Sequence, residues 1–578
     1  MLSTAKNLYF PILRSPTSIA LRRTGFVMPP EDQVSYDQII LSSQRESMAN
    51  HFVLRELSRY DLGTFADIIY RNAILYPDSE AFVCGPHRIT FAQFNERVNR
   101  LIHGLQSLGV QKGDVIGILS WNCLEYTDGY GAAMKGGFVA SPFNPRLHRE
   151  ELEYLINYSE TNTLFVGPEF VETVNILRTR LPKVKRCISL EGSAPDMLSY
   201  PELLTTHSPD EPDVRVRKDD PLIIFYTSGT TGVPRGALYT HGRKLDNTRI
   251  KALEMGTQAG DRHLMVLPFF HIGGDSHVWP FFLVGGCNII MTQRSFDPGA
   301  VLQAIHDEKA TDMQIVPTQL NALLSSQDLE AYNLSSLNRI YYAASPMPVA
   351  LLRKGLEVFG PIFSQGYGQT ESGPQISTLL NEAHDVLDRP PEEQKVLISC
   401  GQPSLGVHVR VVDENNNDVG PGTVGEIIAQ SDSIMVEYWN RPKETRETII
   451  DGWLHTGDLA YYDEKGFMYI VDRKKDMIVT GGENVYSREV EDVLYKHPAI
   501  AEVAVIGIPD PSWVERVHAV AVLKENAVAT ESEIIGFCKE HLASYKTPKS
   551  VEFVEALPKN PQGKILKKEI RATYWADK

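Results

Sequence analysis

The sequence predicts an α/β protein with a large N-terminal domain of two βα-layered subdomains and a small β lobe, followed by a small α+β domain. Three observations support this prediction. Short apolar runs alternate with amphipathic stretches of about 10–15 residues, which indicates βαβ units on a largely parallel sheet. A β-rich segment and then a compact set of helices and strands follow. At 578 residues the chain is also too long for one hydrophobic core.

The first half of the chain carries most of the expected βα units. Thr64 is a candidate helix cap, and Gly109 is placed to end the second helix. We expect helices over 64–76, 89–108, 124–135 and 150–158, and strands over 115–119, 136–140, 164–166 and 222–226.

The second half continues the alternation and then changes character. Strands are expected over 263–268, 313–316 and 339–344, a helix over 300–308, and antiparallel strands over 406–413 and 425–430. The last segment shows helices over 487–496 and 531–542 and strands over 503–506, 519–524 and 551–553. Thr530 and Glu533 form a capping box. We therefore expect a domain over 31–472 and a second over 473–578.

Composition and charge exclude several classes of protein. Hydrophobic residues make up 42% and charged residues 22% of the chain, as in ordinary globular proteins. A net charge of -16 without a Lys/Arg cluster argues against nucleic acid as a partner. Six well-separated cysteines favour a reducing compartment over a disulfide framework or zinc site. No apolar run approaches the ~18 residues of a transmembrane helix, so a cytoplasmic protein is expected.

The segment 1–30 contains no acidic residue. Its four basic residues stand among several Ser and Thr: Lys6, Arg14, Arg22 and Arg23. This composition is typical of a mitochondrial transit peptide, which makes the mitochondrial matrix an alternative location. A flexible tail, or a translation start at Met28, explains the same composition.

A loop of glycines and small hydroxyl residues follows the strand at 222–226. Its members are Thr227, Ser228, Gly229, Thr230, Thr231 and Gly232, and Arg235 adds a positive charge just beyond. Glycine lets the backbone approach a ligand, and successive N–H groups can surround an anion. The loop therefore predicts a phosphate-binding site, although it lacks the Gly-Lys-Ser/Thr of the Walker loop. A polar turn between two strands is the structural alternative.

Four further stretches carry side chains suited to a nucleotide: Gln365–Glu371, Thr456–Asp458, Tyr469–Arg473 and Pro558–Lys564. They offer an aromatic ring, a carboxylate for a hard cation, and cations for phosphate. We expect Asp458 to lie in a loop, where its acid is suited to both hydroxyls of a ribose. Each stretch alone is more often an ordinary turn or solvated loop.

Together, in this order and spacing, the motifs resemble the adenylate-forming acyl-CoA synthetases, which include luciferases and peptide-synthetase adenylation domains. The resemblance runs from about residue 60 to 575. It implies that ATP and Mg²⁺ activate a small-molecule carboxylic acid to an acyl-adenylate, and that coenzyme A then takes the acyl group. It also implies that the C-terminal domain is mobile and turns on a hinge near Lys475.

The resemblance assigns roles to residues of the large domain. Thr227 to Gly232 would hold the β- and γ-phosphates, with Arg235 where the family usually has lysine. The adenine pocket would include Ala343, Ala344, Ser345, Gly366, Tyr367 and Gly368, with Ala343 where glycine is common. Thr370 would contact the α-phosphate and Glu371 the Mg²⁺. Asp458 and Arg473 would hold the ribose, with Ile470 nearby.

Two residues of the C-terminal domain complete the implied site. Lys564 matches the family's adenylation lysine, which bridges the carboxylate and the α-phosphate. Gly482 matches a position that lines the pantetheine tunnel.

The acid is harder to predict. His271 matches the family's gate near the carboxylate, while a histidine that caps a helix is the structural alternative. Gly273, Gly274 and Ala344 are small and favour an open acyl channel, whereas Asp275, Ser276 and His277 are more polar than a fatty-acid tunnel requires. We expect a medium or longer fatty acid, or an aryl or alicyclic acid.

Other functions fit less well. A ligase that loads a carrier protein in trans is the alternative within the family, and luciferase-like oxidation has no support in the residues. A non-catalytic nucleotide sensor would explain the phosphate loop but not Glu371, Asp458 and Lys564 together. A monomer or homodimer is expected.

Overall fold

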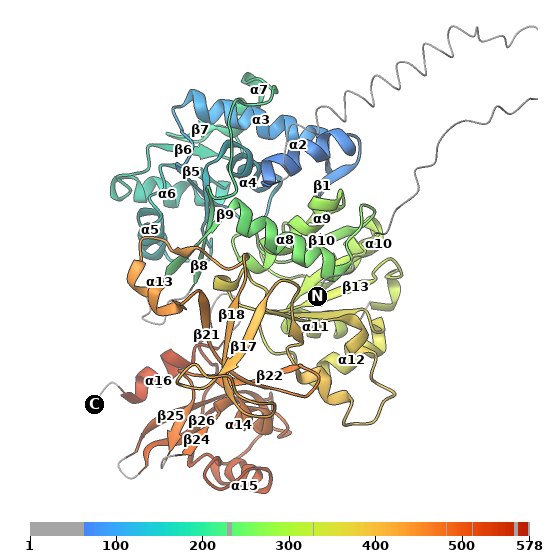
Figure 1. The fold of residues 1–578 in the computed structure, drawn as a ribbon, viewed down its shortest axis with the longest axis vertical. Helices are drawn as coiled ribbons and strands as arrows, with labels where there is room; N and C mark the ends of the chain where they lie inside the picture. Colours follow the sequence, from blue (N-terminus) through green and yellow to red (C-terminus); the bar gives the residue numbers. More distant parts are fainter. Residues whose placement is uncertain are drawn as a thin grey trace, which may run out of the picture. The chain divides into compact units, whose positions relative to one another are not determined.

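The structure is a computed structural model that describes residues 63–227, 234–327, 329–480, 483–510, 513–559 and 565–575 (Figure 1). The basic segment 1–30 lies outside these residues. The predicted α/β class is confirmed: two large mixed sheets and a β lobe form the large N-terminal part, and a small α+β domain follows. The boundary at 472/473 stays a prediction.

One large sheet has nine strands, with a parallel centre and antiparallel edges. In order across the sheet these are β16 (Gln402–Pro403), β15 (Ser377–Leu379), β14 (Phe363–Tyr367), β13 (Arg339–Tyr342), β12 (Asp312–Ile315), β10 (Arg262–Met265), β11 (Cys287–Ile290), β1 (Glu80–Cys84) and β2 (His87–Thr90). The parallel strands are almost wholly buried, as expected for strands covered on both faces.

The other large sheet has eight strands and is also mainly parallel. Its strands in order are β19 (Glu437–Tyr438), β9 (Arg235–Thr240), β8 (Pro221–Thr227), β4 (Val139–Pro142), β3 (Val115–Leu119), β5 (Thr163–Val166), β6 (Arg186–Ser189) and β7 (Leu198–Ser199). One hydrophobic core includes residues from both large sheets, which ties them into one structural unit.

Helices cover the large sheets. They are α2 (Phe65–Leu75), α3 (Phe91–Ser107), α4 (Leu124–Gly136), α5 (Arg149–Tyr158), α6 (Val171–Leu177), α7 (Tyr200–Thr206), α8 (His241–Met255), α9 (Ile272–Val284), α10 (Pro298–Glu308), α11 (Pro317–Leu324) and α12 (Val349–Phe359). Helices α8 and α9, both green in Figure 1, pack against each other. Thr64 caps α2 in a capping box with Asp67, as its position in the sequence predicts.

The predicted β lobe is larger than the segment 406–430. Strands β17 (His408–Val412) and β18 (Gly425–Gln430) pair as expected, but β20 (Ile449–Ile450), β21 (Trp453–Tyr462) and β22 (Met468–Arg473) join the same antiparallel sheet. Helix α13 (Pro442–Thr448) lies between β19 and β20 in the chain. The lobe thus carries two of the predicted nucleotide motifs.

The C-terminal part has its own sheet and core. It consists of β23 (Ile478–Thr480), β24 (Glu483–Val485), α14 (Ser487–Leu494), β25 (Ile500–Asp510), β26 (Val514–Leu523), α15 (Glu531–His541), β27 (Ser550–Phe553) and α16 (Lys567–Trp575). The predicted capping box at Thr530 and Glu533 is present at the start of α15.

The strands predicted over 136–140, 263–268 and 339–344 have wrong bounds, the last because β13 ends at Tyr342. Gly136 belongs to α4, and Gly137 ends that helix with a left-handed φ of 70°, so the strand begins only at Val139. The strand predicted over 263–268 stops at Met265, before the turn that leads into α9. Among the described helices, none combines the length and apolarity needed to cross a membrane. All six cysteines are free thiols.

A buried histidine makes the fold sensitive to acid. His384 is fully buried; its Nδ1 lies 2.9 Å from the Leu380 carbonyl oxygen and its Nε2 3.0 Å from the Tyr342 hydroxyl. Burial lowers the pKa of His384 to about 4 from 6.5. Between these two pKa values, His384 is protonated in the unfolded chain but stays neutral in the folded one. The contribution of His384 to the free energy of unfolding is therefore kept above pH 6.5 and is lost as the pH falls below that value.

We predict that the free energy of unfolding falls by about 2 kcal/mol more in the native protein than in His384→Gln between pH 6.5 and 5. Denaturant unfolding at both pH values measures this difference. His148→Gln, at a histidine whose side chain is 89% exposed, is the control and should keep the native pH dependence. Equal acid sensitivity of His384→Gln and the native protein would contradict the prediction.

Candidate active site

The predicted phosphate loop joins two antiparallel strands, β8 and β9. Thr227 and Arg235 are directly paired across them. Ser228, Gly229, Thr230, Thr231 and Gly232 lie outside the described residues. At the base of the loop, Thr227 Oγ1 and Arg235 Nε are buried and have no hydrogen-bond partner among the residues that the structure describes. Buried polar atoms without partners are rare and indicate a place for a ligand or water.

Arg235 is directed toward Glu371. Its guanidinium stacks 4.2 Å from the centre of the Tyr438 ring, and its Nη2 lies 3.9 Å from Glu371 Oε1. The Tyr438 hydroxyl donates a hydrogen bond of 2.6 Å to the same oxygen. Burial and the nearby Glu371 carboxylate raise the pKa of Tyr438, so this hydroxyl stays a donor.

Thr370 and Glu371 begin a short 3-10 helix that follows β14. Two hydrogen bonds hold the backbone of this turn. The Tyr239 hydroxyl donates to the Thr370 carbonyl, and Met435 N donates to the Glu371 carbonyl at 2.9 Å. Glu371 is 8% exposed. Its carboxylate, 3.9 Å from the Arg235 guanidinium at the base of the loop, is the hard-oxygen ligand that Mg²⁺ prefers. The residues present therefore fit a magnesium ion that is bound together with phosphate.

Asp458 is the centre of the second cluster. Its Oδ2 accepts hydrogen bonds from the Tyr367 hydroxyl at 2.7 Å and from Gln369 Nε2 at 2.8 Å. Arg473 Nε lies 2.7 Å from Oδ1. Although burial opposes its charge, the Asp458 carboxylate raises the pKa of Arg473. Three donors, from β14, from the turn that follows it and from β22, thus converge on one buried carboxylate.

The placement of Asp458 differs from the expected loop. The motif 456–458 lies inside β21, and Asp458 is paired directly with Arg473 on β22. Gly457, with φ of 69°, lets the strand twist at this point. Cross-strand pairing, rather than a loop, brings the two predicted ribose residues together. Ile470 lies on the same strand as Arg473 and is partly buried against the main core.

The predicted adenine turn follows β13. Ala343, Ala344 and Ser345 leave the sheet there, and Ala344 has a φ of 72°, in the left-handed region that disfavours side chains. Gly366 and Gly368 are required by close approach. A Cβ at Gly366 would collide with Tyr341 Oη, and one at Gly368 with the carbonyl oxygen of Pro374.

The hinge region connects β22 to the C-terminal domain. Ser487 N and Oγ, at the start of α14, both donate to the carboxylate of Asp472. Lys567 Nζ donates to Ser487 Oγ at 2.6 Å. Lys475 is exposed, and its carbonyl accepts from Arg571 Nη1 at 3.4 Å. Lys564 and Gly482 lie outside the described residues.

His271 is the N-terminal cap of α9. Its Nδ1 accepts a hydrogen bond of 3.1 Å from Gly273 N, and burial lowers its pKa to about 4. The helix-cap alternative is therefore realised, and a gating role for this neutral imidazole stays a prediction. Gly274 is also needed for packing, because a Cβ there would collide with the Pro268 carbonyl.

The polar residues after Gly274 are fully buried. Asp275 Oδ2 lies 2.5 Å from Lys244 Nζ, and Asp275 Oδ1 accepts from Trp279 Nε1 at 2.7 Å. His277 Nε2 lies 3.1 Å from Asp312 Oδ1. Asp275 and His277 thus have polar partners inside the domain, which accounts for their burial. Their polarity alone is therefore not evidence against a fatty acid.

His263, His277 and Asp312 place one ligand atom each within 4.8 Å of one another. A metal ion does not fit well here. His263 Nδ1 lies 2.7 Å from Asp312 Oδ1, and Arg339 Nε donates to Asp312 Oδ2 at 3.0 Å. The carboxylate is thus already neutralised, and we interpret the trio as a hydrogen-bonded network that holds β10, α9 and β12 together.

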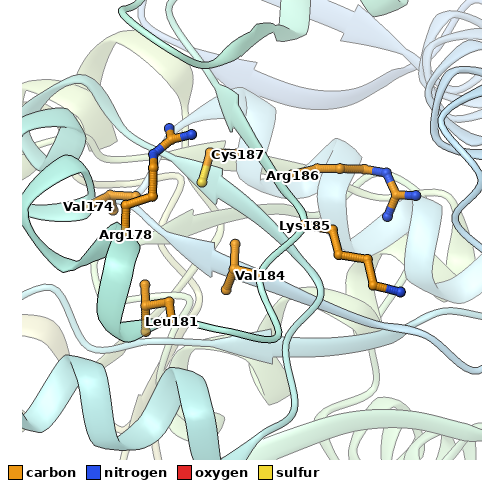
Figure 2. Close-up of a pocket in the computed structure, with 7 residues that line it drawn as sticks. All are labelled: Val174, Arg178, Leu181, Val184, Lys185, Arg186 and Cys187. Carbon is orange, nitrogen blue, oxygen red and sulfur yellow. The ribbon is translucent and has the colours of Figure 1, made fainter.

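A small cavity lies elsewhere, beside α6 and β6 (Figure 2). Val174, Leu181 and Val184 contribute apolar side chains to it, while the charged ends of Lys185 and Arg186 point away from them. Of the predicted site residues that the structure describes, none lines it. It is therefore separate from the two clusters.

Sequence reasoning missed Tyr438 and Gln369. Tyr438 reaches Glu371 because β19 pairs with β9, and the paired residues are about 200 positions apart in the sequence. A local sequence pattern does not predict such a pairing. Gln369 lies inside the quoted motif, and its spacing from Tyr367 was a usable signal.

Comparisons with known proteins place these clusters in context. The family model for AMP-binding enzymes matches residues 69–439, and the model for the AMP-binding enzyme C-terminal domain matches residues 489–564. A medium/long-chain-fatty-acid–CoA ligase of Mycobacterium tuberculosis is 37% identical over 506 residues, covering 85% of this chain and 86% of that protein. A fatty acid–[acyl-carrier-protein] ligase of Streptomyces coeruleorubidus is 34% identical, covering 87% and 94%.

Among solved structures, an anthranilate CoA ligase in complex with anthranoyl-AMP is similar. It has a TM-score of 0.80 and 27% identity, covering 90% of this chain and 98% of that one.

The strained turn at Ala344 gives a test. We predict that Ala344→Gly increases the free energy of unfolding by about 1 kcal/mol, because glycine adopts a positive φ without steric cost. Denaturant unfolding measures the change. The neighbouring Ala343→Gly is the matched control, since Ala343 is not in the left-handed region. Glycine there adds freedom to the unfolded chain and removes a methyl group packed against a hydrophobic cluster, so it should not stabilise. Stabilisation by both variants, or by neither, would contradict the prediction.

Proposed function

The chain belongs to the AMP-binding enzymes, the adenylate-forming acyl-CoA synthetase family, as an AMP-forming acid–thiol ligase, and from this we propose how its residues act and which acid it takes. The acid attacks the α-phosphate of ATP, pyrophosphate leaves, and the thiol of coenzyme A then displaces AMP from the acyl-adenylate. The substrate is a medium or longer fatty acid, or an aryl or alicyclic acid.

The observation that carries the proposal is the convergence of distant motifs on two carboxylates. Asp458 joins Tyr367 and Arg473, and Glu371 lies beside Arg235. Gln369 connects the clusters, because it donates to Asp458 and stands two residues before Glu371. A sensor of nucleotide would need the first cluster but not a carboxylate placed beside a phosphate loop.

Each cluster has a chemical task. In the first, Asp458 accepts from both hydroxyls of a ribose, with Tyr367 and Ala343–Ser345 beside the base. In the second, Thr227, Arg235 and Thr370 bind phosphate oxygens, and Glu371 holds Mg²⁺, which supplies positive charge where negative charge builds up. Arg235 keeps the charge of the usual lysine in a planar, bidentate form.

The C-terminal domain supplies the remaining groups. Lys564 would stabilise the charge between carboxylate and α-phosphate in the first step, and Gly482 would line the pantetheine path in the second. Rotation about Lys475 would exchange the two, which is the usual reason for a small mobile domain in such a two-step reaction.

An acyl carrier protein is the alternative acceptor. It is favoured by one relative whose name specifies a fatty acid and an acyl-carrier-protein.

Six free cysteines, five of them buried, support a reducing compartment, and we propose the cytoplasm.

AMP release from ATP, Mg²⁺ and a panel of carboxylic acids, with and without coenzyme A, tests the proposal. AMP formation that requires both acid and coenzyme A is expected. Pyrophosphate exchange without any thioester would transfer the acceptor role to a carrier protein. ATP binding without AMP formation across the whole panel would contradict the proposal.

We predict that Lys564→Ala loses adenylation by about 100-fold or more but still converts supplied acyl-adenylate and coenzyme A to acyl-CoA. The two half-reactions are measured separately, by pyrophosphate exchange and by thioester formation. Lys559→Ala, in the same segment but with its side chain paired to Glu502, is the control and should keep both. Equal loss of both half-reactions in Lys564→Ala would contradict the assigned role.

A further inference from the structure

Helix α8 buries a polar face. Lys244, Asn247 and Lys251 are spaced by three and four residues, so they lie on one side of the helix. Their exposed fractions are 1%, 1% and 2%. Lysine is almost never buried to this extent without a partner, because an ammonium loses its hydration on burial. This face therefore needs an explanation in terms of what the side chains bind.

The carboxylates nearby are Asp275, Asp312 and Glu254, and each has other partners. Glu254 accepts hydrogen bonds from Gln375 Nε2, from Thr378 Oγ1 at 2.7 Å and from Leu405 N at 2.8 Å. Asp275 lies 2.5 Å from Lys244, and Asp312 binds Arg339. Among the residues that the structure describes, no carboxylate oxygen lies within 4.0 Å of Lys251 Nζ. Lys251 thus has no ion-pair partner among the described residues, although Asp312, Asp275 and Glu254 lie close enough to favour its charged form.

The contacts of Lys251 are weak. Its Nζ lies 3.4 Å from Ser276 Oγ, at the limit of a hydrogen bond, and 4.6 Å from the centre of the Tyr341 ring. A cation over an aromatic ring gains less than the cost of removing an ammonium from water. A negatively charged group placed beside Lys251 would therefore be attracted more strongly than its present neighbours are.

Unmade hydrogen bonds gather in the same part of the domain. Both amide atoms of Asn247, Oε1 of Gln314 and Nδ1 of His277 are buried and have no partner among the described residues. These side chains come from three elements, α8, β12 and α9. Such a concentration of partnerless atoms indicates a place where a polar ligand or water binds.

This polar group adjoins the proposed acyl end of the site. Tyr341 Oη lies against Gly366, on the strand that carries the adenine side. A Cβ built at Gly273, two residues after His271, would lie 3.9 Å from Gln314 Nε2, and one built at Gly373, two residues after Glu371, 3.5 Å from Asn247 Nδ2. The unused donors and acceptors thus lie between the nucleotide strand and the N-terminus of α9.

We propose that the substrate is a carboxylic acid with a second anionic group, which Lys251 binds as an ion pair while the Asn247 amide donates a hydrogen bond. The proposal rests on the proposed function, because it assumes that the acyl chain enters between His271 and Gly366. The reacting carboxylate stays at the nucleotide, and the second group lies at the far end of the acyl chain or ring.

The protonation of Lys251 agrees with this assignment. Burial, followed by the nearby Lys244, lowers the pKa of Lys251 to about 7. A bound anion would offset both effects and keep the ammonium charged. A plain hydrocarbon chain at the same place would desolvate Lys251 further and leave the partnerless atoms unpaired.

The experiment compares matched acids with the full-length protein. Straight-chain dicarboxylates of different lengths, and an aromatic dicarboxylate, are each paired with the monocarboxylate of the same skeleton. The kcat/KM of AMP release is measured for both members of each pair. We expect the best dicarboxylate to exceed its partner by about tenfold to 100-fold, the value of one charge-assisted hydrogen bond.

Variants test the assigned residue. Lys251→Met keeps a long unbranched side chain and removes the charge. It should lower kcat/KM for the dicarboxylate by about tenfold or more, while kcat/KM for the monocarboxylate is unchanged or improved. Arg249→Met, which removes a charge from a 44% exposed side chain of the same helix, should keep the native preference. If Lys251→Met does not fold, Lys251→Gln replaces it.

The outcomes separate the two proposals. Preference for the monocarboxylate in every pair, or a dicarboxylate preference that both Lys251 variants retain, would overturn the inference and leave the ligase function intact. No AMP from any acid would overturn the proposed function and this inference with it.

Discussion

The shared carboxylate of Asp458 is the interaction on which the site depends. It binds Tyr367 at the end of β14, Gln369 just beyond it, and Arg473 on β22, so one buried anion joins the nine-stranded sheet to the β lobe. A buried carboxylate with several donors is strongly held, and the loss of any donor leaves the rest badly matched. The relative position of Tyr367 and Arg473 therefore follows from a single charge.

The second cluster depends on the first through the chain. Gln369 and Glu371 flank Thr370, so the bond from Gln369 to Asp458 fixes where the Glu371 carboxylate begins. Tyr438 then orients Glu371, and Arg235 stacks on the ring of the same tyrosine. Opposite charges are held close but not in contact, at 3.9 Å, which leaves both able to bind phosphate and metal.

The sequence predicted what local patterns encode. Helix starts were predicted from the capping residues Thr64, Thr530 and Glu533. Buried strands such as β3 and β5 were predicted from apolar runs. Motif residues were also recognisable, but Asp458 was assigned to a loop because cross-strand pairing leaves no local trace. Helices α8 and α9 were not predicted: α8 buries lysines that resemble an exposed face, and α9 is apolar on all sides and contains Pro280.

Gly366 has a consequence for changing the specificity of this enzyme. A hydrogen atom on its Cα separates the nucleotide strand from the ring of Tyr341, which in turn supports Lys251. In the proposed function, the Tyr341 ring alone therefore separates the nucleotide strand from the lysine assigned to the acyl end. A replacement of Tyr341 that is meant to change the acyl pocket would also alter the packing of the strand that carries Tyr367. A variant selected for a new acid would therefore need further substitutions near the adenine pocket that restore this packing.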